Sequence, residues 1–266
     1  MKKHISTGQG DVYYFADLEF PGRPTVVLLH GLSSNHTTWD TIVERLHTEK
    51  INSIAWDQRG HGHSDKVKRR SNYRLPVFSD DLYRILNAEN VTHANFVGYS
   101  YGVPILLELA KNHADIIDGL VLISGNFVSP NKYMRLGLLS PLLYGLFQLG
   151  GWLMFPQFRK KYYYYKHGEA SGYWQSTIRG LSTMPLSINA WMFSLVFPMN
   201  YRRVLSIIKA PTVIVRADHD PFFSAAEAAE MAKTMPNAHL FSPKHPSHFV
   251  ASRSQDEISD LILSTV

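Results

Sequence analysis

Short unbroken apolar runs alternate along this chain with longer segments whose apolar residues recur at helical spacing. An unbroken run is typical of a strand buried on both faces. Six such runs lie at residues 25–29, 51–56, 94–97, 116–124, 211–217 and 238–241. Helical spacing follows near residues 39–50, 74–89, 103–109, 225–235 and from 254 onward. This alternation predicts an α/β fold with a mostly parallel central sheet flanked by helices on both faces. Segments 12–15 and 18–20 are expected to add a short edge hairpin.

The alternation stops between residues 126 and 203. This stretch contains four consecutive tyrosines at 162–165, and residues 136–158 include no charged side chain. A membrane-spanning helix is one interpretation, but Pro141, Pro156 and several glycines argue against it. We therefore expect a helical cap at 126–203, inserted into a core domain formed by residues 1–125 and 204–266. Peripheral contact of the cap with membrane lipid stays open, because basic residues flank the uncharged stretch.

Composition narrows the possible chemistry. The 266 residues, 45% hydrophobic, suffice for one large core, and the absence of cysteine excludes disulfides, thiolate catalysis and cysteine-ligated metals. The net charge of +5 is spread along the chain, so we expect no nucleic-acid partner. The N-terminus has no apolar secretory segment, which favours a cytoplasmic location. The histidines show no metal-ligand spacing on a helix, so no metal is expected.

The segment Gly98-Tyr99-Ser100-Tyr101-Gly102 follows an apolar strand and precedes a helix. A Gly-x-Ser-x-Gly in that context is the signature of a nucleophile elbow, in which a strained turn presents the serine hydroxyl. The same residues are also compatible with a plain turn that carries a serine N-cap. The rest of the chain favours the first interpretation.

A nucleophilic serine needs a base, and the base needs a carboxylate. The loops after two later strands supply Asp220 and His248. Asp218 is a weaker candidate for the acid, because Asp220 directly precedes Pro221. His245 is a weaker candidate for the base and suits an exposed loop. An oxyanion hole also needs two convergent N–H groups.

The two groups expected for the oxyanion hole belong to Leu32 and Tyr101. Leu32 follows His30-Gly31 at the end of a strand, and Tyr101 follows the serine. His30, His61 and His63 are expected to be structural or solvated. Asp57 and Arg59 are expected to pair or to form hydrogen bonds within their own turn.

Taken together, these motifs resemble the α/β-hydrolase fold family, in its branch of small cap-bearing esterases, lipases and carbon–carbon hydrolases. The resemblance rests on the His-Gly loop, the Asp-x-Arg-Gly-x-Gly-x-Ser stretch from Asp57 to Ser64, the elbow, and the acid and base loops. The chain departs from the family pattern at Ala217 and Ser247, which replace glycines, and at Val103, which replaces a small residue. These departures affect loop geometry and helix packing rather than catalytic atoms.

The resemblance implies a serine hydrolase without a cofactor that cleaves a small-molecule carboxylic ester through an acyl-enzyme. The aromatic and aliphatic cap suggests an apolar substrate, such as a medium-chain ester or a monoacylglycerol-like lipid. The serine at the elbow argues against epoxide hydrolase or haloalkane dehalogenase chemistry, for which the family would require an aspartate. Hydrolysis of a lactone or of a carbon–carbon bond remains an alternative, although Phe249 stands where carbon–carbon hydrolases often have tryptophan. A non-catalytic ligand-binding relative is the other alternative.

Overall fold

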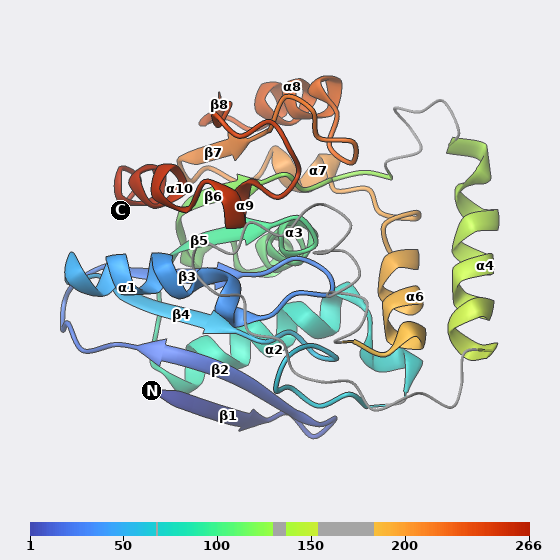
Figure 1. Ribbon diagram of the computed structural model, residues 1–266, viewed down its shortest axis with the longest axis horizontal. Helices are drawn as coiled ribbons and strands as arrows, with labels where there is room; N and C mark the ends of the chain where they lie inside the picture. Colours follow the sequence, from blue (N-terminus) through green and yellow to red (C-terminus); the bar gives the residue numbers. More distant parts are fainter. Residues whose placement is uncertain (68, 130–136, 154–183) are drawn as a thin grey trace.

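The computed structural model describes residues 1–67, 69–129, 137–153 and 184–266. Eight strands form one sheet in the order β1-β2-β4-β3-β5-β6-β7-β8 (Figure 1). The β1-β2 and β2-β4 pairs are antiparallel and all the other pairs are parallel, which confirms the predicted mostly parallel sheet. The strands are β1 Lys2–Ser6, β2 Asp11–Asp17, β3 Thr25–Leu29, β4 Asn52–Trp56, β5 Ala94–Tyr99, β6 Ile117–Ile123, β7 Thr212–Val215 and β8 Ala238–Phe241.

The edge hairpin differs from the prediction. It is formed by β1 and β2, and residues 18–20 are not a strand. The backbone of Phe20 is satisfied instead by the Asn52 side chain, which accepts its N–H at 3.0 Å and donates to its carbonyl at 2.9 Å. The outer strand β1 is half exposed and contains Lys2, Lys3 and His4, so its sequence lacks the apolar run by which buried strands are identified.

Helices cover both faces of the sheet, as predicted. One face packs against α2 (Leu75–Ala88), α3 (Gly102–His113), α7 (Arg202–Leu205) and α8 (Ala225–Thr234). The other packs against α1 (Asp40–Thr48), α9 (Val250–Arg253) and α10 (Gln255–Leu263). Successive side chains of a strand point to opposite faces, so in β3 Val27 and Leu29 join the first core while Val26 and Leu28 join the second. Burial on both faces explains the unbroken apolar runs.

Two helices of the expected cap lie within the described residues, α4 (Ser140–Leu153) and α6 (Leu186–Ser194). They lie side by side, with α6 toward the core and α4 outermost (Figure 1). Gly151 allows this approach, because a Cβ there would lie 2.5 Å from the ring of Trp191. The four tyrosines at 162–165 and the rest of residues 154–183 lie outside the described range. The division of the chain into core and cap therefore stays a prediction.

Both ends of the expected insertion lie next to each other in the sheet domain. Val128 and Asn200 form an isolated antiparallel bridge. Beside it, the Tyr201 N–H donates to the Phe127 carbonyl at 2.8 Å, and the Ser129 N–H donates to the Met199 carbonyl at 3.0 Å. The chain thus leaves the core after β6 and returns before α7 through one short antiparallel pairing. In the described part of the chain, no helix has the length and apolarity needed to cross a membrane.

Candidate active site

The turn between β5 and α3 presents Ser100 in a strained conformation. Ser100 has φ of 51°, in the left-handed region that non-glycine residues rarely adopt. Glycines are required on both sides of it. A Cβ on Gly98 would lie 2.8 Å from Leu106 Cδ1, and one on Gly102 would lie 2.7 Å from the Leu29 carbonyl oxygen. The strand and the helix can therefore approach closely enough to lift the serine hydroxyl out of the turn, as the elbow motif predicts.

Three side chains from separate loops form a continuous hydrogen-bonded row. His248 Nε2 lies 3.0 Å from Ser100 Oγ, and His248 Nδ1 lies 2.8 Å and 3.0 Å from the two Asp220 carboxylate oxygens. Asp220 follows β7, and His248 lies in the loop after β8. Because Nδ1–H donates to the carboxylate, Nε2 is left to accept the serine proton. The structure thus brings together all three residues predicted from the sequence.

The other candidates for acid and base lie away from this row. The Asp218 side chain is 67% exposed and pairs with Arg216 at 3.7 Å. His245 Nδ1 lies 3.1 Å from Ser247 Oγ. The geometry therefore favours Asp220 and His248 over these two neighbours in sequence.

Electrostatics keep Asp220 ionised. Burial raises the pKa of this carboxyl, but the hydrogen bond and charge of His248, the Phe222 N–H and the Ser124 hydroxyl together outweigh burial and lower the pKa below its ordinary value. The carboxylate oxygen Oδ1 also accepts the N–H groups of Phe222 at 2.9 Å and Phe223 at 3.1 Å. An ionised carboxylate at this position stabilises a positively charged imidazole.

The loop after β3 lies against Ser100. A Cβ on Gly31 would lie 3.2 Å from Ser100 Cβ, so this loop passes directly beside the serine. Within the part of the chain that the structure describes, the N–H groups of Leu32 and Tyr101 donate to no other protein group. Tyr101 is also the N-cap residue of α3, where unpaired N–H groups favour negative charge. These are the two donors predicted for an oxyanion hole.

Comparison with known proteins agrees with this geometry. Residues 24–167 match the family defined by the alpha/beta hydrolase fold. The chain belongs to the alpha/beta hydrolase fold family. The first curated relatives are uncharacterized mycobacterial proteins, 29% identical over 106 residues, and the match spans only 30% of their length.

Two further comparisons extend over most of this alpha/beta hydrolase. Epoxide hydrolase 3 of Xenopus tropicalis is 25% identical over 90% of this chain and 70% of its own. Among solved structures, the enol-lactonase from Burkholderia xenovorans LB400 superposes with a TM-score of 0.75 at 20% identity, covering 99% of both chains. The structural likeness establishes the fold, and the sequence likeness establishes membership of a hydrolase family.

Two buried histidines hold the loop that carries Leu32. His30 Nδ1–H donates to the Gly31 carbonyl at 2.8 Å, and its Nε2 accepts the Gln58 N–H at 3.2 Å. His61 Nε2 accepts the Ser33 N–H at 3.0 Å. Burial is the main cause that lowers the pKa of His30 to about 4 and that of His61 well below its ordinary value. Both rings therefore stay neutral at pH 7, and their hydrogen bonds fix the backbone of this loop.

The turn after β4 is organised differently from the prediction. Asp57 does accept a hydrogen bond within its turn, from the His63 N–H at 2.7 Å, but its main partner is His36, whose N–H and Nδ1 lie 2.7 Å and 2.9 Å from Oδ1. Burial raises the pKa of Asp57, but the hydrogen bond and charge of His36, the charge of His30 and the His63 N–H together outweigh burial and hold this pKa at about 2. Arg59 leaves the turn to pair with Asp81 of α2. Long-range partners such as these leave no local signal in the sequence.

Residues near the row that the sequence did not assign are Ser124, Tyr99 and Asn189. Ser124 ends β6 with φ of 50°, and the Tyr99 hydroxyl donates to the His248 carbonyl at 3.1 Å. The Ser33 hydroxyl donates to Asn189 Oδ1 of α6 at 2.5 Å, which ties α6 to the loop of Leu32. Of these three residues, Ser124 alone could have been found from the sequence, because it ends the apolar run at 116–124.

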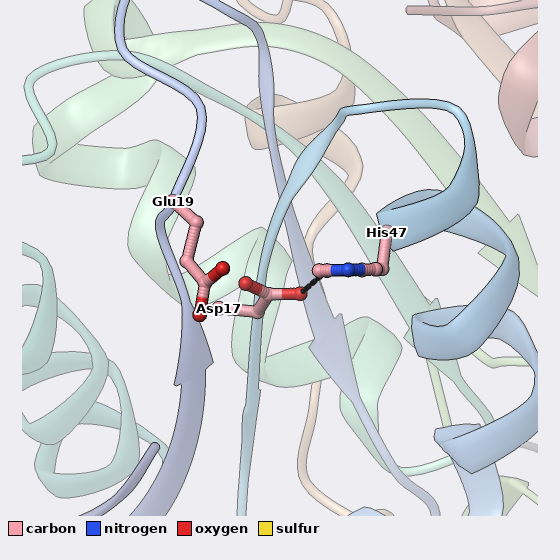
Figure 2. A group of neighbouring side chains, drawn as sticks. All are labelled: Asp17, Glu19 and His47. Carbon is pink, nitrogen blue, oxygen red and sulfur yellow. Dashed lines mark hydrogen bonds and ion pairs between the residues drawn. The ribbon is translucent and has the colours of Figure 1, made fainter.

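One group of side chains has ligand types that suit a metal ion. Asp17, Glu19 and His47, here called the carboxylate–histidine cluster, place their ligand atoms within 4.8 Å of one another (Figure 2). His47 Nδ1 already pairs with Asp17 at 2.7 Å. Asp17 is in register with Ser53 near the start of β4, whereas Asp57 follows the end of that strand. The cluster therefore lies at the edge of the sheet opposite Ser100 and cannot supply a ligand to the reacting atoms.

Proposed function

We propose that this alpha/beta hydrolase cleaves carboxylic esters by acyl transfer through Ser100. The observation that carries the proposal is the continuous row from Ser100 Oγ through His248 to Asp220, with 3.0 Å and 2.8 Å between successive groups. Both are hydrogen-bond distances. The first lets the proton pass directly from Ser100 to His248, and the second holds the imidazole and stabilises its positive charge.

In the first step, Ser100 Oγ attacks the ester carbonyl carbon while His248 Nε2 takes the hydroxyl proton. The carbonyl oxygen becomes an oxyanion, which the N–H groups of Leu32 and Tyr101 stabilise. The tetrahedral intermediate then collapses, and His248 returns the proton to the departing alcohol. Water, deprotonated by His248, next attacks the acyl-enzyme, and Ser100 leaves with that proton as the acid product is released.

Epoxide opening fits this site less well, although relatives over most of the chain carry the name epoxide hydrolase. Attack by a serine oxygen on an epoxide carbon would form an ether. An ether has no electrophilic carbonyl through which water can release the product, whereas an ester formed by a carboxylate nucleophile has one. The serine at position 100 therefore supports acyl substrates, which include open esters and lactones.

The proposed substrate is an apolar ester. The described part of the cap is rich in aliphatic and aromatic residues, and α6 contacts the loop that carries Leu32 through Asn189. An acyl chain that leaves the oxyanion hole would therefore lie near this helix. Hydrolysis of a carbon–carbon bond is the competing reaction on the same row, and turnover of a coloured ring-fission product would distinguish it.

The test is covalent labelling with a fluorophosphonate probe, followed by intact mass and peptide mapping. The wild type is expected to gain one adduct on Ser100, and Ser100→Ala and His248→Ala are expected to gain none. His245→Ala, a loop histidine outside the row, serves as the matched control and is expected to label normally. A folded wild type that does not react would contradict an activated serine and support a non-catalytic binding protein. A positive result would be followed by a chain-length series of esters and lactones.

A further inference from the structure

We propose that the outer face of α4 is a membrane-docking surface that lies on bilayers containing anionic lipid. This face, here called the outer stripe, consists of Leu138, which precedes the helix, and Leu142, Leu146, Leu149, Trp152 and Leu153. Their exposed fractions lie between 53% and 97%. The inference concerns a surface and does not depend on the proposed ester chemistry.

The outer stripe follows helical geometry. Steps of three and four residues from Leu138 to Leu153 place these side chains on one side of the helix. The opposite side is already occupied. The ring centroid of Phe147 lies 4.9 Å from that of Phe193 and 5.7 Å from that of Phe197. The Gln148 side chain donates a hydrogen bond to the Ser194 hydroxyl at 2.5 Å. A surface helix normally turns its polar side to water. Here α4 instead turns an apolar side outward. Its other side packs on α6, which lies between α4 and the sheet in Figure 1.

The chemistry of the stripe suits a bilayer better than a protein groove. The helix contains no charged residue, so seating it in lipid would require no ionic group to lose water. Trp152 is 69% exposed at the end of the helix, and tryptophan is favoured at the boundary between acyl chains and headgroups. Contiguous exposed apolar surface of this kind marks an interaction site.

Exposed positive charge next to α4 suits anionic lipid. Arg70 Nη2 lies 3.2 Å from the Tyr144 hydroxyl of α4, and Arg69 and Arg70 are both exposed. Basic residues next to an interfacial apolar face attract anionic headgroups. Because α4 lacks the length to span a bilayer, it would lie in the plane of the membrane surface.

The first experiment is co-sedimentation of the full chain with vesicles of phosphatidylcholine and phosphatidylglycerol in equal parts, and with phosphatidylcholine alone. The wild type is expected to bind the anionic vesicles. Leu142→Glu/Leu146→Glu/Leu149→Glu is expected to lower the affinity at least about ten-fold, because three charges would have to enter the acyl boundary. The matched control is Ile207→Glu, an exposed apolar position on the core domain, and is expected to bind as the wild type does.

A second pair of variants tests the charge. Arg69→Gln/Arg70→Gln is expected to weaken binding to anionic vesicles by roughly five-fold for each arginine, whereas Arg203→Gln/Lys209→Gln removes the same charge elsewhere and should change little. The fluorescence of Trp152 in the wild type is a second measure of vesicle binding, and it does not depend on whether the variants fold. Its emission in the wild type should shift to the blue with anionic vesicles, and Trp152→Phe should lose that shift.

Three outcomes would overturn the proposal. They are a wild type that neither sediments nor shifts its emission, a triple variant that binds as tightly as the wild type, and a dimer that the triple variant dissociates without any vesicle binding. The last result would assign the stripe to a second copy of this chain. Fluorophosphonate labelling of the same preparations keeps a failure of the ester proposal separate from a failure of this one.

Discussion

Glu227 offers a quantitative test of the electrostatics close to the site. It lies in the first turn of α8, is 1% exposed, and accepts a hydrogen bond from the Asn126 side chain at 2.8 Å. Asn126 also donates to the Phe222 carbonyl at 2.8 Å, which connects Glu227 to the acid loop. Burial raises the pKa of Glu227 from 4.5 to about 7.

This raised pKa has a predictable sign in the free energy of unfolding. Below pH 4.5 the carboxyl is protonated in both the folded and the unfolded state, so it does not lower the free energy of unfolding. Between pH 4.5 and about 7 the unfolded chain releases the proton while the folded chain retains it, so stability falls as pH rises. The difference between the two pKa values, at ~1.4 kcal/mol per unit, gives about 3 kcal/mol at pH 8. Glu227→Gln removes this loss and should be more stable than the wild type at pH 8.

The assay is urea unfolding at several values between pH 4.5 and 8. The stability of Glu227→Gln relative to the wild type should rise through this range by an amount of that order and then level off. Glu44→Gln, on the exposed side of α1, is the matched control and should show no such rise. A difference between Glu227→Gln and the wild type that is independent of pH would refute the argument, because it would mean that Glu227 titrates alike in both states.

Three further results are expected. If Ser100 and His248 act as proposed, Asp220→Asn should lower kcat about 10³- to 10⁴-fold in ester hydrolysis while Asp218→Asn leaves it unchanged, since of the two carboxylates Asp220 contacts His248; equal effects would contradict the proposed mechanism. Asp81→Asn should cost about 3–5 kcal/mol in urea unfolding because it leaves the buried guanidinium of Arg59 without its carboxylate, and a loss below ~1 kcal/mol would argue against that pair. Dialysis against a chelator should leave ester hydrolysis unchanged, because the carboxylate–histidine cluster lies at the opposite edge of the sheet; lost activity restored by a metal would contradict the metal-free mechanism.

Much of the fold could be predicted because strands buried on both faces must be apolar throughout. The run at 25–29 gave β3 its exact bounds, and the elbow glycines stand where a Cβ would collide with Leu106 or the Leu29 carbonyl. The edge strand β1 escaped prediction because half of its surface faces water. The pairs Asp57–His36 and Arg59–Asp81 could not be predicted because each joins residues more than twenty positions apart in the sequence. Nothing in a loop's own sequence specifies a partner at such a distance.

The bridge between Val128 and Asn200 bears on how this scaffold can diversify. Val128 and Asn200 pair with each other at the two ends of the expected insertion. The segment between them is therefore a loop that closes on itself, and its length does not change the distance that the core has to span. The entropy of closing a loop grows only slowly with its length, so longer or shorter caps can be exchanged at this junction at little cost to the folding of the sheet. Ser100, Asp220 and His248 all lie outside the segment between the two bridge residues. We therefore expect a cap exchanged between these two residues to leave the sheet and the row of Ser100, His248 and Asp220 in place, while the contact of Asn189 with the Ser33 loop would have to be rebuilt.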